Sequence, residues 1–341
     1  MLETDYLEHS LKLSKETLPL LKQGKNLLAF SAGVDSSALF FLLLENNVSF
    51  DIALVNYNLR EQSKEEEKHA IELAKKYKLQ AHTIHAPSFE NNFEKNARDF
   101  RYSFFDKLMK NYDNLLTAHQ LNDQLEWFLM RLTKGAGTVE LIGLEAVSKR
   151  ENYQLIRPLL QHSKEELFNY LNKAQYPYFI DESNSSEQYE RNRFRKEFSD
   201  NLIVQYQQGI TRSLNYLQKD KETLLDKVEE LFHQQEFYLL KYTQKNKVRV
   251  IDKYLKKLGY LLSGKQRKEL EKENSIVIGG LWAVEQDKDK IYIAPHLKIK
   301  MPKYFKESCR ISNIPTKVRP YLYKENINPK EVISKINQSS L

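Results

Sequence analysis

The strongest constraint on the fold is an apolar run at residues 27–30 that leads into a short turn of small and polar residues. Residues 36–45 follow as a segment that is apolar on nearly every side of a helix. A continuous apolar run before a buried helix predicts a central parallel strand and its crossover helix. The turn then lies at the carboxyl end of the strand, where open α/β sheets bind ligands.

Small side chains in this turn let the backbone approach a phosphate, and the helix N-terminus offers N–H groups and the positive end of a dipole. An ordinary turn, with Asp35 or Ser36 capping the helix, is the alternative interpretation. The turn resembles the Ser-Gly-Gly-x-Asp-Ser loop of the PP-loop ATP pyrophosphatases, which release pyrophosphate while they adenylate a substrate. The resemblance implies that ATP is bound by the loop residues, which are Ser31, Ala32, Gly33, Val34, Asp35, Ser36 and Ser37.

Two features of the loop depart from related patterns. It contains no lysine, so it differs from the Gly-x-x-x-x-Gly-Lys-Ser/Thr loop of kinases and GTPases. Ala32 occupies the position of the family's first glycine. A methyl group is a small intrusion there, tolerated if the φ angle of Ala32 is negative.

The composition predicts a soluble cytoplasmic protein with no membrane partner. The apolar content is 41%, and no uninterrupted apolar stretch is long enough to span a membrane. The acidic first five residues are opposite in charge to the start of a secretory signal. Cys309 is the only cysteine, which excludes an internal disulfide or a Cys-x-x-Cys pair and fits a reducing compartment.

The net charge of +7 is unevenly distributed along the chain. Residues 206–341 contain 27 Lys and Arg against 16 Asp and Glu, whereas residues 1–205 contain 26 against 30. A basic second half is typical of a protein that binds a polyanion, most often nucleic acid. A solvated lysine-rich surface would give the same balance.

Strands and helices alternate through the first part of the chain, which predicts a mostly parallel α/β sheet with helices on both faces. The resemblance to PP-loop enzymes implies the same class, that of the adenine nucleotide α-hydrolases. Strands are predicted at residues 27–30, 49–56, 80–84 and 114–118, and helices at residues 1–24, 36–45, 63–77, 92–110, 122–132 and 163–174.

The second part has a different texture. Helical spacing of apolar residues predicts helices at 190–202 and 220–240. Residues 275–284 and 290–294 read as two strands of a hairpin. We therefore expect a domain of residues 1–210 and a smaller, mainly helical domain of residues 211–341 that ends in a short hairpin.

A second polar junction follows the strand at 114–118 and contains His119, Asp123 and Glu126. Parallel strands end at one edge of a sheet, so this junction should lie beside the first loop. Asp123 and Glu126 are three residues apart and share one helical face. They would hold Mg²⁺ or a cationic substrate. Helix capping and dipole pairing are the alternative.

Six ordered segments resemble the bacterial tRNA(Ile)-lysidine synthetases. Residues 31–37 match the loop described above, and residues 116–137 resemble Thr-Ala-His-x-x-Asp-Asp-Gln-x-Glu followed by Arg-Gly-x-Gly. The other segments are 56–60 (Asn-His-x-Leu-Arg), 97–102 (Ala-Arg-x-x-Arg-Tyr), 157–160 (Arg-Pro-Leu-Leu) and 181–195 (Asp-x-Ser-Asn, then Arg-Asn-x-x-Arg). One such motif is a weak signal, but six in order make coincidence improbable.

Besides Ala32, three positions depart from these family motifs. Asn122 replaces the first acid of Asp-Asp, Tyr57 replaces a histidine, and Lys134 replaces an arginine. The change at position 122 puts more weight on Asp123 and Glu126. Lysine at position 134 keeps the charge but loses the planar fork of arginine.

The resemblance implies an ATP-dependent ligase that acts on the AUA-decoding isoleucine tRNA with a CAU anticodon. In this reaction, the C2 carbonyl oxygen of the wobble cytidine (position 34 of the tRNA) is adenylated with release of pyrophosphate. The ε-amine of L-lysine then displaces AMP. The residues implied as catalytic are Asp35, His119, Asp123 and Glu126, with Mg²⁺ on Asp35 and Asp123 and with Arg98 on ATP.

Clustered cationic side chains are expected on phosphates of ATP or RNA. For tRNA they are Arg101, Arg131, Lys134, Arg191, Arg193 and Arg195. Ion pairs with nearby acids such as Asp99, Asp106, Glu187 or Glu190 are the alternative for the arginines.

The sequence leaves two other functions open. One is another PP-loop enzyme that modifies tRNA or forms an amide, although cysteine-dependent thiolation is disfavoured because Cys309 stands alone. The other is an RNA-binding protein without catalysis. The sequence leaves the oligomeric state open, a homodimer included.

Overall fold

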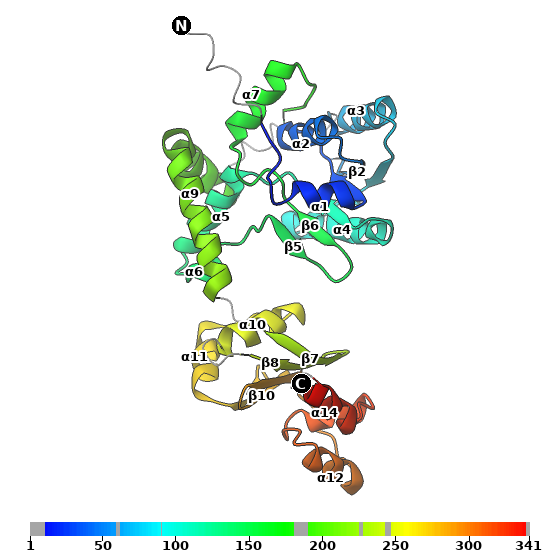
Figure 1. The fold of residues 1–341 in the computed structure, drawn as a ribbon, viewed down its shortest axis with the longest axis vertical. Helices are drawn as coiled ribbons and strands as arrows, with labels where there is room; N and C mark the ends of the chain where they lie inside the picture. The colour runs from blue at the N-terminus through cyan, green and yellow to red at the C-terminus, as the bar shows by residue number, and fades with distance from the viewer. Residues whose placement is uncertain are drawn as a thin grey trace. The chain divides into compact units, whose positions relative to one another are not determined.

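The computed structural model describes residues 11–58, 62–89, 91–180, 190–224, 228–242 and 247–338. The chain divides into two compact units, residues 1–222 and 223–341 (Figure 1). Each unit is built on its own sheet, of six and five strands respectively. Residues 1–10 of the predicted first helix, and residues 59–60 and 181–184 of the family motifs, lie outside the described ranges.

The sheet of the first unit has the strand order β3-β2-β1-β4-β6-β5. All neighbouring strands pair in parallel except β5, which runs antiparallel to β6. The predicted mostly parallel sheet is thus confirmed. The strands are β1 (Asn26–Ala29), β2 (Phe50–Asn56), β3 (Ala81–His85), β4 (Asn114–Leu116), β5 (Val147–Lys149) and β6 (Gln154–Ile156).

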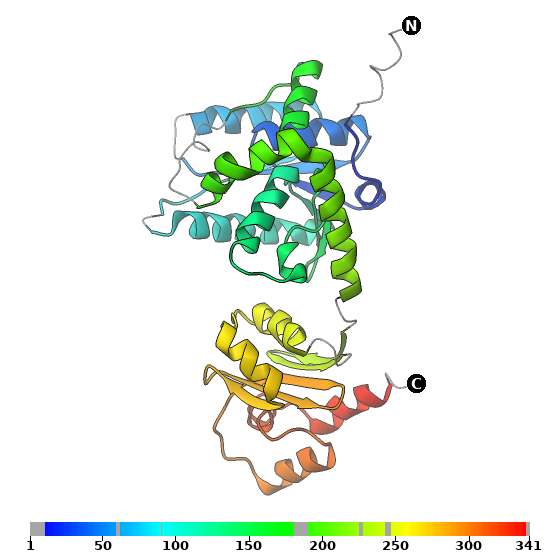
Figure 2. The same ribbon diagram turned by 90° about the vertical axis from the view of Figure 1, so that its left-hand side faces the viewer.

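Helices cover both faces of this sheet because successive strand residues point to opposite sides (Figures 1 and 2). Leu28 and Leu116 pack with α2 (Val34–Glu45), α3 (Gln62–Lys76) and α7 (Lys164–Ala174). Their chain neighbours Leu27 and Leu115 pack with α4 (Phe93–Leu108) on the other face. The remaining helical segments are α1 (Leu18–Gln23), η1 (Met109–Asn111), α5 (Leu121–Leu132), α6 (Thr138–Leu141), α8 (Glu190–Phe194), η3 (Arg195–Ser199) and α9 (Asp200–Leu224).

The strand order reverses direction at β1, which lies between β2 and β4. The chain adds β2 and β3 on one side of β1 and then crosses to add β4 on the other side. Such a switch point leaves a crevice outside the carboxyl ends of the two central strands. The loops after β1 and β4 therefore meet there.

The second unit differs from the expectation in its secondary structure. Its sheet has the order β7-β8-β11-β10-β9 with antiparallel neighbours, so the expected hairpin, β10 (Trp282–Asp287) with β11 (Lys290–Pro295), is part of a larger sheet. The other elements are β7 (Glu229–Gln234), β8 (Phe237–Lys241), β9 (Ser275–Ile278), α10 (Lys247–Lys257), α11 (Gly264–Lys272), α12 (Lys303–Ile311), α13 (Arg319–Lys324) and α14 (Pro329–Gln338).

Two predictions for this unit were wrong. The predicted helix at 220–240 ends at Leu224, and β7 and β8 follow as a hairpin that turns at Gln235 with φ +52°. The predicted strand at 275–284 is broken at Gly279 and Gly280, whose φ values of +58° and +70° make a turn between β9 and β10. In the described part of the chain, no helix is long and apolar enough to cross a membrane.

Candidate active site

A cavity of about 240 Å³ opens at the switch point of the first unit and is lined by both strand-end loops. Asp35 at the start of α2 and Asp123 at the start of α5 both line it. The rest of the polar lining is Ser31, Ser36, Arg101, Thr117 and His119, and the apolar and aromatic lining is Ala29, Phe30, Ala53, Val55, Tyr57, Tyr102, Phe105 and Ala118. The two loops predicted to converge therefore share one cavity.

The loop after β1 presents helix N–H groups to this cavity. Gly33 is the N-cap of α2, in place of Asp35 or Ser36, and within the described residues no side chain caps it. The hydroxyl of Ser36 instead holds the loop, accepting from the Ser31 N–H at 3.2 Å and donating to the Gly33 carbonyl at 3.1 Å. The first turn of α2 is thus available to an anion.

Ala32 has a φ of +59°, so the condition of a negative φ is not met. Its carbonyl accepts hydrogen bonds from the Phe179 N–H at 2.8 Å and from the Ser37 hydroxyl at 3.2 Å. These contacts hold the peptide in the left-handed region, where glycine is preferred. The loop keeps the glycine-type conformation although the side chain carries a methyl group.

Asp35 is the most perturbed carboxyl group at the cavity. Burial, followed by repulsion from Asp123, raises its pKa to about 7. Its Oδ1 atom is buried and has no hydrogen-bond partner among the described residues. A buried acceptor in this state favours a proton or a cation.

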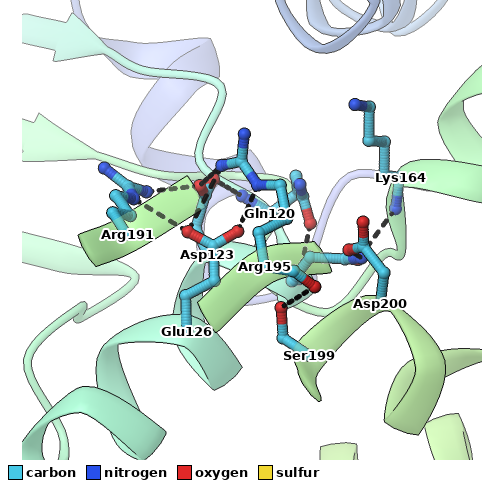
Figure 3. Close-up of polar contacts among 9 residues, drawn as sticks. Gln120, Asp123, Glu126, Lys164, Arg191, Arg195, Ser199 and Asp200 are labelled. Atoms are coloured by element: carbon cyan, nitrogen blue, oxygen red, sulfur yellow. Dashed lines mark hydrogen bonds and ion pairs between the residues drawn. The ribbon is translucent and has the colours of Figure 1, made fainter. Parts of the chain in front are cut away.

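Asp123 and Glu126 do not form an open acidic pocket (Figure 3). Glu126 is fully buried, and its two carboxylate oxygens accept from Nε of Arg191 at 2.8 Å and Nε of Arg195 at 2.5 Å. Arg191 Nη2 also donates to Asp123 Oδ1 at 2.6 Å, and the Gln120 N–H donates to Asp123 Oδ2 at 3.0 Å. Two guanidinium groups therefore neutralise the two acids.

The spacing of the arginines explains this arrangement. Arg191 and Arg195 are four residues apart and reach the same side, whereas Arg193 lies between them and is exposed. The alternative that these arginines form ion pairs is therefore realised for Arg191 and Arg195, with Asp123 and Glu126 as partners. Arg193 remains accessible to a phosphate.

Asn122, the departure from the Asp-Asp motif, joins three elements. Its Nδ2 donates to Asp200 Oδ1 of α9 at 2.7 Å, and its Oδ1 accepts from the backbone N–H of Lys164 in α7 at 3.2 Å. An aspartate at position 122 could not donate to Asp200. The amide side chain is therefore matched to the carboxylate that faces it.

His119 is held in the cavity wall, with Nδ1 at 3.0 Å from the Thr117 hydroxyl. Burial lowers its pKa to about 4, so the imidazole is neutral near pH 7. A neutral imidazole can accept a proton.

The other predicted cationic residues lie apart from one another. Arg101 lines the cavity, whereas Arg98 stacks on Tyr102 at 5.0 Å and lines a separate hollow of about 1130 Å³. Arg131 stacks on Trp127 at 4.5 Å, and Lys134 pairs with Glu190 at 2.7 Å. Arg101 therefore lines the cavity itself, whereas Arg98 contacts Tyr102, a residue that borders both the cavity and the hollow.

Two tyrosines at the cavity were not among the predicted site residues. Tyr57 follows β2 and donates its hydroxyl to the Ala97 carbonyl at 3.2 Å, and Tyr102 lines the wall contributed by α4. The signal for Tyr57 was its position immediately after a strand end. For Tyr102, the only sequence signal was its position in the family motif at residues 97–102.

Comparison with known proteins relates the chain to characterised families. Residues 4–202 match the sequence profile of the PP-loop domain family. A protein named tRNA(Ile)-lysidine synthase from Campylobacter jejuni (strain RM1221) is 45% identical over 320 residues, covering 93% of this chain and 98% of the relative. The protein of the same name from Helicobacter pylori (strain ATCC 700392 / 26695) is 43% identical, covering 91% and 93%.

The fold also resembles a solved structure. The U34-tRNA thiolase NcsA from Methanococcus maripaludis, determined with its [4Fe-4S] cluster, superimposes with a TM-score of 0.52 at 17% identity. The superposition covers 74% of this chain and 86% of the thiolase. At this identity the likeness concerns the fold alone.

Proposed function

The chain belongs to the PP-loop family and, within it, to the tRNA(Ile)-lysidine synthases, and from this premise we propose how its cavity carries out the ligation. The members of this family are ligases that use ATP. We propose that the C2 carbonyl oxygen of the wobble cytidine attacks the α-phosphorus of ATP with release of pyrophosphate, and that the ε-amine of L-lysine then displaces AMP. The observation that carries the proposal is the single cavity lined by Asp35 and Asp123.

The loop after β1 is suited to the phosphates. The N–H groups at the start of α2 would meet an anion without competition from a capping side chain in the described part of the chain. The hydroxyl of Ser31, which lies 3.1 Å from that of Ser36, lines the same cavity. Arg101 supplies a fixed positive charge in the same lining. The aromatic side chains of Tyr57 and Tyr102 offer flat surfaces to a nucleobase that has left its stack.

Asp35 fits a Mg²⁺ ion in the way that ATP-dependent enzymes hold one, with one or two carboxylates and substrate phosphates. Its orphaned Oδ1 is the supporting observation. Asp123 is a weaker candidate because both its oxygens already accept hydrogen bonds. Within the described ranges no group of three or more His, Cys, Asp or Glu side chains is placed to hold a metal by itself. Bound Mg²⁺ would neutralise phosphate charge.

The lysine amine requires an acceptor for its proton and a group that orients it. His119 is neutral and lines the cavity, so it is placed to accept the proton. Asp123 lines the same cavity and orients the amine. Glu126 acts indirectly. It is fully buried and holds Arg191 and Arg195 against Asp123.

The first unit carries catalysis in this proposal, and the basic second unit grips the tRNA. The segment before and within α12 supports this assignment, because four exposed lysines lie within six residues of Tyr304 in the sequence, and Tyr304 is 73% exposed. Exposed lysines contact phosphates and an exposed aromatic ring stacks on a base. The lysines are Lys298, Lys300, Lys303 and Lys306.

Pyrophosphate release from ATP tests the proposal. It should require both the isoleucine tRNA with a CAU anticodon and L-lysine for full turnover, and labelled lysine should appear in the tRNA. Lysine-independent consumption of ATP without any label in the tRNA would indicate another PP-loop reaction. A protein that binds the tRNA but releases no pyrophosphate would be a binding protein.

A further inference from the structure

The phosphate loop contains no lysine, yet one lysine from another element lies beside it. Lys164 is the first residue of α7, and α7 packs against α2 in the same core. Its charge acts on Asp35, the central acid of the loop. We propose that Lys164 binds the two phosphates of ATP that leave as pyrophosphate, an inference that rests on the proposed function.

The position of Lys164 is fixed through its backbone. The Lys164 N–H donates to Asn122 Oδ1 at 3.2 Å, and the His162 carbonyl accepts from the N–H of Leu121 at 2.8 Å. Both contacts tie the start of α7 to the start of α5, which carries Asp123. The base of the lysine side chain is therefore held at the start of α5, where its contact partner Asn122 immediately precedes the cavity-lining Asp123.

The ammonium group of Lys164 is available to a ligand. Figure 3 shows the side chain extending away from Asp200, with the ammonium group outside the network of contacts that holds the backbone. Within the described residues, this ammonium group makes no hydrogen bond or ion pair, and the side chain is half-buried. A lysine in this state has all three N–H donors available for a ligand.

Helix stability gives no reason for a lysine at this position. The N-terminal end of a helix carries partial positive charge, so a cation in the first turn is unfavourable. The start of α7 is already stabilised without it, because Ser163 and Glu166 form a capping box. A bound polyphosphate would reverse the sign of the interaction, since the lysine and the helix end would then face the same anion.

The chemistry needs a cation at this point. As the cytidine oxygen bonds to the α-phosphorus, the bond from that phosphorus to the bridging oxygen breaks, and the electron pair stays on pyrophosphate. Negative charge therefore grows on the departing group, and a fixed ammonium group stabilises it in the transition state. Lys164 would act on ATP but not on AMP, which lacks these phosphates.

Binding of ATP and of AMP to the full chain, compared for wild type and Lys164→Met, tests the proposal. We expect Lys164→Met to weaken ATP binding about 10- to 100-fold, the loss of one charge-assisted contact, and to change AMP binding by less than about twofold. Pyrophosphate release should slow as well, and Lys164→Arg should restore most of the ATP affinity. Lys173→Met, which removes an exposed lysine from the last turn of the same helix, is the matched control and should leave both affinities unchanged.

Equal affinity of wild type and Lys164→Met for ATP would overturn the assignment, and so would an equal loss for ATP and AMP. The melting temperature of Lys164→Met should be unchanged or higher, because the variant removes a cation from the positive end of α7. The proposed function can fail separately. A wild-type chain that incorporates no lysine into tRNA would refute it, while the difference between ATP and AMP would still report on Lys164.

Discussion

Asn122 and Asp200 form a hydrogen bond of 2.7 Å between α5 and α9, with the amide nitrogen of Asn122 as the donor. The bond depends on the amide at position 122, which stands in place of the first acid of the Asp-Asp motif that this segment resembles. It places the start of the helix that bears Asp123 against a second helix. The departure from the family motif is therefore matched by its structural neighbour.

Asn122→Asp should destabilise the fold by about 1–3 kcal/mol, because two carboxylates would meet in a mostly buried contact and Asp200 would lose its donor. Asp200→Asn in the same chain should recover most of the loss. Urea unfolding of both single variants and the double variant measures the coupling. Additive losses in the double variant would show that the two side chains do not interact.

Ala32→Gly should stabilise the protein by about 1 kcal/mol, because only the alanine pays for a φ of +59°. Ala32→Val should have the opposite effect, since a β-branched side chain tolerates positive φ poorly. Thermal unfolding of the two variants checks both signs. The matched control is Gly33→Ala, whose backbone has a φ of −75° and so carries no such penalty. A less stable glycine variant would contradict the backbone assignment.

Asp35→Asn should abolish turnover and at the same time stabilise the ligand-free protein. The folded-state pKa of about 7 lies above the usual value of 3.8, so burial of the ionised carboxylate costs stability as the pH rises from about 4 to 7. The advantage of the asparagine variant should therefore grow by on the order of 2 kcal/mol between pH 5 and pH 8. Denaturant unfolding at the two pH values measures it. If the stability difference between the variant and wild type is the same at both pH values, Asp35 is not a buried carboxyl group with a raised pKa.

Glu126→Gln should destabilise the first unit by about 3–5 kcal/mol, because it removes one of the two carboxylates that neutralise Arg191 and Arg195 in a partly buried site. Glu165→Gln, which changes an exposed acid in the first turn of α7, is the control and should cost less than about 1 kcal/mol. Unfolding free energies give the comparison. Equal costs for the two variants would mean that the arginine cluster contributes little to stability.

The lysines around Tyr304 should govern tRNA affinity without affecting the cavity. A variant with Lys298, Lys300, Lys303 and Lys306 all changed to Gln should bind tRNA more weakly, with a salt slope reduced by about three to four. Binding of ATP should be unchanged. Filter binding across a range of salt concentrations measures the slope. An unchanged salt slope would contradict this role of the four lysines and would place the tRNA contacts elsewhere.

The position of the cavity could be predicted from the sequence because it depends on local patterns and one topological rule. Residues 27–30 and 114–118 read as strands, and parallel strands end at one edge of the sheet. The loop after each strand then had to lie at that edge. The positions of Asp35 and Asp123 at the cavity follow from this step alone.

Other features depend on contacts between distant segments, which no local pattern reveals. The φ of Ala32 is fixed by the N–H of Phe179, and the charge of Glu126 is neutralised by Arg191 and Arg195 from a later segment. The four-residue spacing of the arginines was visible, but their partners were not. The turn at Gln235 lacks the Gly, Asn or Pro that marks a hairpin, and the helical spacing of the apolar residues before it therefore predicts a helix.

A crystal structure with L-lysine and a non-hydrolysable ATP analogue tests most directly whether one cavity serves both substrates. The phosphates should lie on the N–H groups at the start of α2, beside Asp35, with the lysine amine within hydrogen-bond distance of Asp123 in the same cavity. Nucleotide density in the separate hollow that Arg98 lines, or a lysine bound away from Asp123, would contradict this arrangement.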